Sequence, residues 1–210
     1  MAKILVAIPC MDTTPTQFTR SLINLKLLPG TAVCMKENSL VYDSRNLMSL
    51  TAIEQGFDYV FWLDSDVIVP PDTLQRLLKT AETFPADMVT GLYVKRREPI
   101  IPVIYDVLEE PAVDESGKLV GRVHEYSNYP RDSLFKVKGC GFGCCFTSVS
   151  LLKAVWDKFG PAFSPYPWAG EDISFCHRVN QLGYDIYCDS TISCGHVGQM
   201  IYTEQLLIER

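Results

Sequence analysis

The sequence has no long apolar stretch and carries more acidic than basic residues. No run approaches the roughly 18 to 20 consecutive apolar residues of a membrane-spanning helix, and the first apolar run, residues 4–8, stops at Pro9. We therefore expect no transmembrane segment, no signal peptide and a cytoplasmic location. Nineteen Lys and Arg stand against 25 Asp and Glu, a formal charge of −6. This balance argues against a nucleic-acid partner, because such surfaces need an excess of positive charge.

Two common catalytic signatures are also missing. The sequence has no Gly-x-Ser-x-Gly elbow, which argues against a serine hydrolase of that type. The glycine-rich segment 139–143 lacks the Lys-Ser/Thr ending of a phosphate-binding loop. Hydrophobic residues make up 47% and charged residues 21% of the 210 positions, which is typical of one ordered globular domain.

Eight cysteines are present, but a chain of this size does not need disulfides to fold. We expect them to be reduced, and most to be small buried apolar groups. Cys140, Cys144 and Cys145 invite a zinc interpretation, but no fourth ligand is evident and their spacing is not that of Cys-x₂-Cys pairs. Buried packing is the better interpretation.

Strand and helix patterns alternate in the first half. Such alternation predicts a largely parallel sheet with helices on both faces. Thr14 is expected to cap the first helix, with Pro15 at its first helical position. Leu47, Leu50 and Ile53 recur at helical spacing and predict the inner face of the second helix. The predicted strands are 3–8, 31–35, 58–63 and 87–93, and the predicted helices begin near 14, 43 and 72.

The alternation then breaks. Residues 98–136 are rich in proline and predict an irregular lobe of short antiparallel strands, with a turn at 114–117. Two helices are expected after it, over 148–159 and 170–182, and a last strand over 184–188.

Asp64, Ser65 and Asp66 follow the most hydrophobic predicted strand. In open parallel sheets, ligands bind at the carboxyl ends of the strands. Two carboxylates there are hard oxygen ligands that suit a divalent cation carrying phosphate oxygens. The plainer interpretation is a turn or a helix cap, where Asp is also common.

Two later segments are candidates for chemistry. Glu171 and Asp172 fall in the first turn of a predicted helix, where a carboxylate could act as a general base or could simply cap the helix. Tyr166 and Trp168 just before them offer flat faces of the kind that stack on sugars. His196 lies in a Gly-flanked loop and could be a structural hydrogen-bonding group or a ligand. A site of Asp66 and His196 would suit Mn²⁺ better than Mg²⁺.

Taken in order, these motifs resemble those of GT-A-type, family-two-like nucleotide-sugar glycosyltransferases. Residues 64–66 resemble the DxD motif, Glu171-Asp172 the xED motif and His196 the C-terminal metal-binding histidine. Ile8-Pro9, the Arg45-Asn46 pair and the segment 139–143 are similar to further family features. The resemblance implies a Rossmann-like three-layer α/β sandwich with a mainly parallel central sheet and small antiparallel elements. It implies a single domain over 1–210, with a nucleotide-sugar-binding half (1–95) and an acceptor-binding, catalytic half (96–210).

The resemblance also implies roles for individual residues. Asp66 and His196 would hold the cation, and Asp64 would contact it indirectly or contact the donor. Asp172 would be the base, with Glu171 orienting the acceptor or the base. The remaining implied residues are Pro9, Glu37, Arg45 and Ser65 for the nucleotide sugar, and Gly139, Gly141 and Trp168 for the acceptor.

The expected function is metal-dependent transfer of a sugar from a nucleotide-diphosphate donor, a UDP-sugar by preference. The acceptor would be a hydroxyl of a sugar, a lipid-linked sugar or a protein, and the protein could be a homo-oligomer. Inversion with Asp172 as the base is favoured over retention. The alternatives are a nucleotidyltransferase, for which residues 10–14 lack a basic residue, and a non-catalytic sugar-binding module, in which an acidic motif could be lost. The basic residues Lys95, Arg96, Arg97, Arg122 and Arg131 could hold a phosphate or serve surface solvation.

Overall fold

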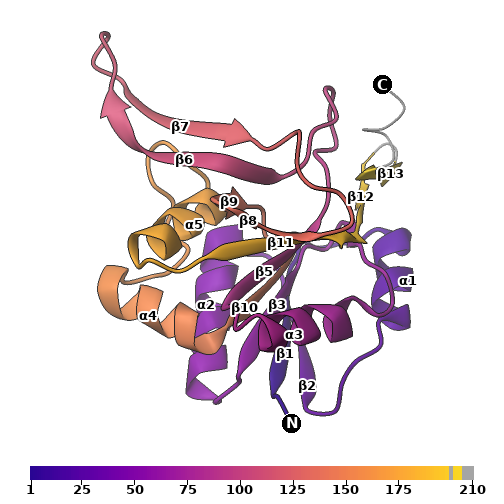
Figure 1. The fold of residues 1–210 in the computed structure, drawn as a ribbon. Helices are drawn as coiled ribbons and strands as arrows, with labels where there is room; N and C mark the ends of the chain where they lie inside the picture. Colours follow the sequence, from indigo (N-terminus) through magenta and orange to yellow (C-terminus); the bar gives the residue numbers. More distant parts are fainter. Residues whose placement is uncertain (199–200, 205–210) are drawn as a thin grey trace.

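The structure is a computed structural model that describes residues 1–198 and 201–204. Its centre is a seven-stranded sheet in the order β2-β1-β3-β10-β5-β11-β8, with helices on both faces (Figure 1). The strands of this sheet are β1 (Ile4–Pro9), β2 (Thr31–Lys36), β3 (Tyr59–Leu63), β5 (Met88–Leu92), β8 (Leu134–Val137), β10 (Cys144–Ser148) and β11 (Ile186–Ser193). The helices are α1 (Thr16–Asn24), α2 (Val41–Glu54), α3 (Thr73–Thr83), α4 (Val149–Phe159) and α5 (Glu171–Gln181).

The sheet is mixed but mostly parallel. β2, β1, β3, β5 and β11 point the same way, whereas β10 and β8 run opposite to them. β10 lies between β3 and β5 and pairs antiparallel with both. The predicted fold class, an α/β sandwich with a mainly parallel central sheet, is confirmed.

Two hydrophobic cores fill the space between the sheet and its helices, which gives three layers. One core packs α2, α4 and α5 against one face of the sheet, through residues such as Met48, Leu152 and Phe175. The other packs α1 and α3 against the opposite face, through Phe18 and Leu77. The central strand β3 is covered on both faces, as its continuous apolar sequence predicts.

Several local predictions need correction. α1 begins at Thr16, with Pro15 at the N-cap and no side-chain cap, so Thr14 is not the cap. The inner face of α2 was predicted from Leu47, but Leu47 is 49% exposed. The buried positions of α2 are instead Ser44, Arg45, Met48, Ser49 and Ala52. α4 agrees with prediction, because Ser148 caps it by accepting from the Leu151 backbone N–H and Gly160 ends it at φ +78°.

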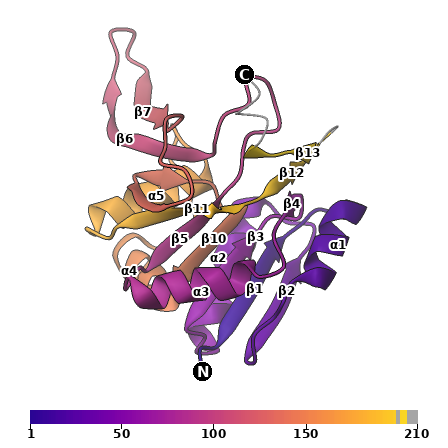
Figure 2. The same cartoon turned by 45° about the vertical axis from the view of Figure 1, so that its right-hand side comes forward.

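The lobe after β5 contains the predicted antiparallel pieces, and they are more regular than expected. β6 (Ile104–Val113) and β7 (Leu119–Glu125) form a long hairpin, and β6 also pairs with β9 (Gly139–Cys140). This hairpin projects beyond the central sheet on the side of α5 (Figures 1 and 2). The predicted turn at 114–117 closes it, with Asp114 accepting from the backbone N–H groups of Ser116 and Lys118.

The strand predicted over 184–188 is present as β11, but it spans Ile186–Ser193 and is not the last strand. Two short strands follow it, β12 (Gly195–Val197) and β13 (Ile201–Tyr202). β12 pairs antiparallel with β4 (Val67–Ile68), the short strand directly after Asp66. His196 is therefore part of a strand and not of a loop. None of the helices in the described residues has the length and apolar character needed to cross a membrane.

Candidate active site

The Asp64-Ser65-Asp66 turn lies where β3 ends, at the carboxyl edge of the parallel strands. The Asp64 backbone N–H donates to the Gly143 carbonyl at 3.1 Å, which fixes the turn against the segment before β10. The Val67 N–H donates back to the Asp64 carbonyl at 3.0 Å. The apolar strand thus delivers both carboxylates to the sheet edge, where they can meet a ligand.

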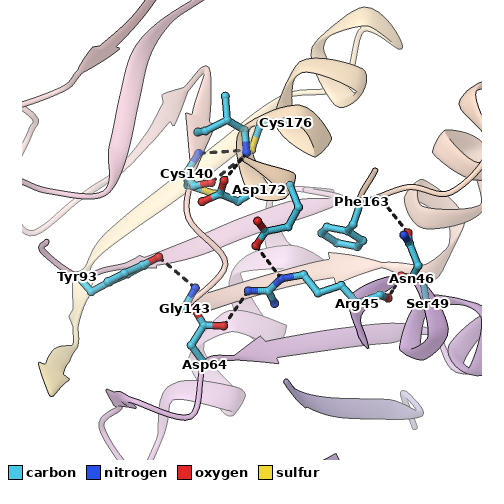
Figure 3. Close-up of polar contacts among 12 residues, drawn as sticks. Arg45, Asn46, Ser49, Asp64, Tyr93, Cys140, Gly143, Phe163, Asp172 and Cys176 are labelled. Carbon is cyan, nitrogen blue, oxygen red and sulfur yellow. Dashed lines mark hydrogen bonds and ion pairs between the residues drawn. The ribbon is translucent and has the colours of Figure 1, made fainter. Parts of the chain in front are cut away.

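Arg45 joins the two acidic motifs. Its Nη2 is 2.7 Å from Asp64 Oδ1 (Figure 3). Its Nε is 3.4 Å from Glu171 Oε1. The guanidinium lies over the ring of Phe142 and is only 2% exposed. Burial alone would lower the pKa of Arg45, but the nearby carboxylates of Asp64 and Glu171 outweigh it and raise this pKa. Arg45 is therefore a permanent buried cation between the motifs.

Asp66 and His196 come together, although they are far apart in the sequence. His196 Nε2 is 3.6 Å from Asp66 Oδ1, because β12 pairs with β4 next to the acidic turn. The backbone also links the two strands, with Val197 N–H donating to the Asp66 carbonyl at 2.8 Å. Burial would raise the pKa of Asp66, but His196 and Arg96 outweigh it and lower this pKa. Asp66 is therefore a carboxylate at neutral pH.

The ring of His196 is oriented by a backbone carbonyl. Its Nδ1 is 2.8 Å from the carbonyl oxygen of Val94. Because a carbonyl can only accept, Nδ1 carries a proton, and Nε2 is the ring nitrogen that faces Asp66, where its lone pair is available to a cation once that atom carries no proton. Metal-binding histidines are held in this way by a partner on the other ring nitrogen.

Asp172 is the base candidate, in the first turn of α5. Its Oδ1 accepts from the Ile173 backbone N–H at 2.7 Å, and its side chain is partly exposed. Desolvation, reinforced by the neighbouring Glu171 carboxylate, raises the pKa of Asp172 to about 6. The carboxylate can thus take up a proton near neutral pH, as a general base requires.

The acceptor-side residues have close neighbours. Trp168 stacks on Tyr166 at 5.7 Å, and its indole lies so close to Gly121 of β7 that a Cβ there would overlap it. Gly141 is buried, and a Cβ on it would overlap the Tyr93 hydroxyl. These contacts give packing reasons for Gly141 and Trp168, and their acceptor roles, like that of Gly139, stay predictions.

A pocket with an empty volume of about 580 Å³ opens at this edge of the sheet. Most of the residues predicted for the nucleotide sugar line it, but Glu37 does not and is exposed. The predicted residues that line it are Pro9, Arg45, Asp64, Ser65, Asp66 and Glu171. Sequence reasoning missed Cys10, Met11, Ser39 and Val41, which also line it. Cys10 and Met11 could have been found, because they directly follow Pro9 at the end of β1.

The residues present fit a divalent cation that takes some of its ligands from the protein and the others from a bound molecule. Among residues 1–198 and 201–204, no three His, Cys, Asp or Glu side chains are grouped so that they could hold a metal ion alone. Asp66 and the lone pair of His196 Nε2 offer two donors, one carboxylate and one imidazole. A diphosphate and water would supply the remaining oxygens, as is usual for Mg²⁺ and similar ions at phosphate sites. The predicted cation site is thus chemically consistent but depends on its ligand.

The mixed, mainly parallel sheet flanked by helices, with acidic side chains at its carboxyl edge, has the architecture of the GT-A-like fold. The sequence also matches the family described as Glycosyl transferase family 2, over residues 38–156. Because this match covers more than half of the chain, the protein belongs to glycosyl transferase family 2. Arg45, Asp64, Asp66 and the segment 139–143 lie inside the matched range, whereas the xED motif and His196 lie outside it.

Solved structures with the same fold are distant in sequence. The crystal structure of A197 from STIV is 18% identical, covers 94% of this chain and 86% of its own, and has a TM-score of 0.67. The crystal structure of GalNAc-T7 with UDP, GalNAc and Mn²⁺ is 12% identical with a TM-score of 0.62. The match covers 93% of this chain but only 43% of the GalNAc-T7 chain. A search of curated protein sequences finds no match. The structural likeness establishes the fold.

Proposed function

We propose that this glycosyltransferase moves a sugar from a UDP-sugar to an acceptor hydroxyl with inversion, and that it needs a divalent cation, Mn²⁺ in preference to Mg²⁺. The observation that carries the proposal is the meeting of Asp66, which lines the pocket, with His196 across β4 and β12, 3.6 Å apart. GalNAc-T7, which has the same fold, was crystallised with UDP and Mn²⁺.

Each residue has a defined task in this proposal. Asp66 and His196 Nε2 would hold the cation, which when bound supplies positive charge to the departing diphosphate. Arg45 holds the Asp64 carboxylate in place at the pocket wall. Pro9 and Ser65 line the space for the nucleotide sugar.

Asp172 is the proposed base. The acceptor oxygen forms a bond to the anomeric carbon and gives its proton to the Asp172 carboxylate. The bond from the anomeric carbon to the diphosphate breaks, and the electron pair leaves with the diphosphate. A pKa of about 6 makes Asp172 a stronger base than an ordinary carboxylate while leaving it mostly ionised at pH 7.

We also propose a cytoplasmic location. All eight cysteines are free, and seven of them are buried. Free thiols are typical of a reducing compartment. Fractionation of the native host tests this location, and recovery only outside the cytoplasm would refute it.

A nucleotide-release assay tests the function directly. Purified protein is incubated with UDP-, GDP- and CDP-sugars in Mn²⁺, Mg²⁺ or EDTA, and the released nucleotide is measured. We expect release from a UDP-sugar that Mn²⁺ supports best and EDTA abolishes. Asp66→Asn and His196→Ala should lose this release, whereas the exposed controls Asp185→Asn and His124→Ala should keep it. Undiminished release by Asp66→Asn would refute the metal role.

The role of Asp172 has its own test. Asp172→Asn should lose transfer by at least about a hundredfold, the usual range for a missing general base, and should bind UDP as tightly as wild type. A large loss of UDP affinity would instead make Asp172 a donor-binding residue. Release of pyrophosphate from a nucleoside triphosphate mixed with a sugar phosphate, and no release of a nucleoside diphosphate from the nucleotide sugars, would make the protein a nucleotidyltransferase.

A further inference from the structure

Arg96 places a second guanidinium at the acidic turn. Its Nη1 pairs with Asp66 Oδ2 and lies 3.3 Å from the carbonyl oxygen of Val197. His196 contacts the other carboxylate oxygen of Asp66. Arg96 therefore stands beside the two residues proposed to hold the cation, and it neutralises Asp66 there.

The two aspartates of the turn pair with arginines that differ strongly in solvent exposure. Arg45, which pairs with Asp64, is 2% exposed and packed among aromatic rings. Arg96, which pairs with Asp66, is 52% exposed. A buried ion pair is costly to open, whereas an exposed pair contributes little and exchanges readily. The cation on Asp64 is thus fixed, and the cation on Asp66 is exchangeable.

The backbone that carries Arg96 is anchored on both sides. The Lys95 N–H donates to the Ile101 carbonyl at 2.8 Å, and Val94 bridges to Pro102. Lys95 Nζ also pairs with Glu125 of β7 at 2.8 Å. The Arg96 side chain can therefore change direction while its Cα stays near the site.

Space for that change lies next to the ion pair. A pocket open to solvent lies there, lined by Tyr93, Lys95, Arg96, Arg97, Val103 and His196. His196 stands between this pocket and Asp66. An Arg96 side chain that leaves Asp66 thus remains beside the proposed cation site.

We propose that Arg96 is an exchangeable counter-ion of the donor site. In the empty protein it neutralises Asp66 and competes with the divalent cation. When cation and nucleotide bind, it leaves Asp66 and donates to the diphosphate oxygens, for which the planar guanidinium is well suited. This inference rests on the proposed function, and it makes Arg96 a donor-binding residue that lowers the affinity for free metal.

The competition predicts that removing Arg96 tightens metal binding. Binding of Mn²⁺ alone is measured by the loss of the free-ion signal in electron paramagnetic resonance, without nucleotide or turnover. Arg96→Ala should bind Mn²⁺ roughly fivefold more tightly than wild type, as expected for release of a partly exposed ion pair. Arg96→Lys keeps the charge and should bind it like wild type. Arg97→Ala, an exposed neighbour in the same segment, is the matched control and should also be unchanged.

Nucleotide binding should change in the opposite direction. With saturating Mn²⁺, calorimetry should show UDP binding weakened roughly tenfold in Arg96→Ala, because a charge-assisted contact to phosphate is lost. Arg96→Lys should fall between Arg96→Ala and wild type. Unchanged or weaker Mn²⁺ binding by Arg96→Ala would overturn the competition, and unchanged UDP binding would overturn the diphosphate contact. Either result overturns the proposal.

Failure of this inference can be told from failure of the proposed function. If wild type and Asp66→Asn bind Mn²⁺ equally, or if neither binds it even in the presence of UDP, the metal site itself is wrong and the inference falls with it. If Asp66→Asn loses Mn²⁺ binding and Arg96→Ala behaves like wild type, only the role of Arg96 is wrong. Melting temperatures of all variants verify that each is folded.

Discussion

Replacing Asp172 by Asn should make the protein more stable while it abolishes transfer. The carboxylate lies in the first turn of α5, close to Glu171, and is half-buried. Asn has nearly the same shape, and its side-chain oxygen can still accept from the Ile173 N–H. The substitution therefore removes a charge and little else.

The size of the effect follows from the raised pKa. Asp172 has a pKa of about 6 in the folded protein, against 3.8 for an ordinary Asp. Above pH 6 the carboxylate is ionised in both states, and the folded state bears the full cost of its charge. Below pH 3.8 it is protonated in both states, and the cost disappears. Because one pKa unit corresponds to 1.36 kcal/mol, the shift from 3.8 to about 6 costs up to about 3 kcal/mol.

Urea unfolding at several pH values measures this cost. The free energy of unfolding of Asp172→Asn should exceed that of wild type by about 0.5 kcal/mol at pH 4 and about 3 kcal/mol at pH 8. Asp185→Asn, at an exposed aspartate paired with Lys136, serves as the control and should show no comparable gain with pH. A difference that is equal at pH 4 and pH 8, or a less stable variant at pH 8, would refute the reasoning.

Four further outcomes are expected. The initial rate of transfer, measured from pH 5 to 8, should rise through about pH 6 as Asp172 loses its proton. Arg45→Met should lower the free energy of unfolding by about 3 kcal/mol, because Asp64 and Glu171 lose a buried partner. Gly141→Ala should cost about 2 kcal/mol in the same assay, because its Cβ would overlap the Tyr93 hydroxyl. Gly139→Ala should cost less than about 1 kcal/mol, because the nearest atoms lie 3.6 Å from its Cβ.

The parallel half of the fold could be predicted from local patterns. β1, β3 and β5 are short apolar runs, and helices with an apolar stripe separate them, so alternation alone indicates parallel strands. The place of β10 could not be predicted in this way. Its sequence, Cys144–Ser148, marks it as a buried strand, but only packing across the whole chain inserts it antiparallel between β3 and β5.

The inner face of α2 was predicted incorrectly for a physical reason. Hydrophobic periodicity assumes that the most apolar face of a helix turns inward. α2 turns Arg45 inward and leaves Leu47 exposed, because carboxylates from two other segments stabilise the buried guanidinium. The partners that decide the orientation of this helix are remote in the sequence, so its own pattern could not reveal them.

His196 shows how far the sequence alone could predict the site. The sequence could suggest the residue, because its chemistry complements that of Asp66. It could not suggest the strand β12, which has three residues and exists because it pairs with β4 and β13. The carbonyl of Val94 that orients the imidazole also has no signature, because every residue carries a carbonyl.

Arg45 also bears on the division of the chain into two halves, which stays a prediction. Its partner Asp64 belongs to the predicted donor half, and its other partner, Glu171, opens the helix that carries the proposed base. One buried guanidinium thus bridges the acidic turn and the first turn of α5, and we expect a change at Arg45 to affect both motifs. Asp66 pairs instead with the exposed Arg96, the cation that the proposal above makes exchangeable.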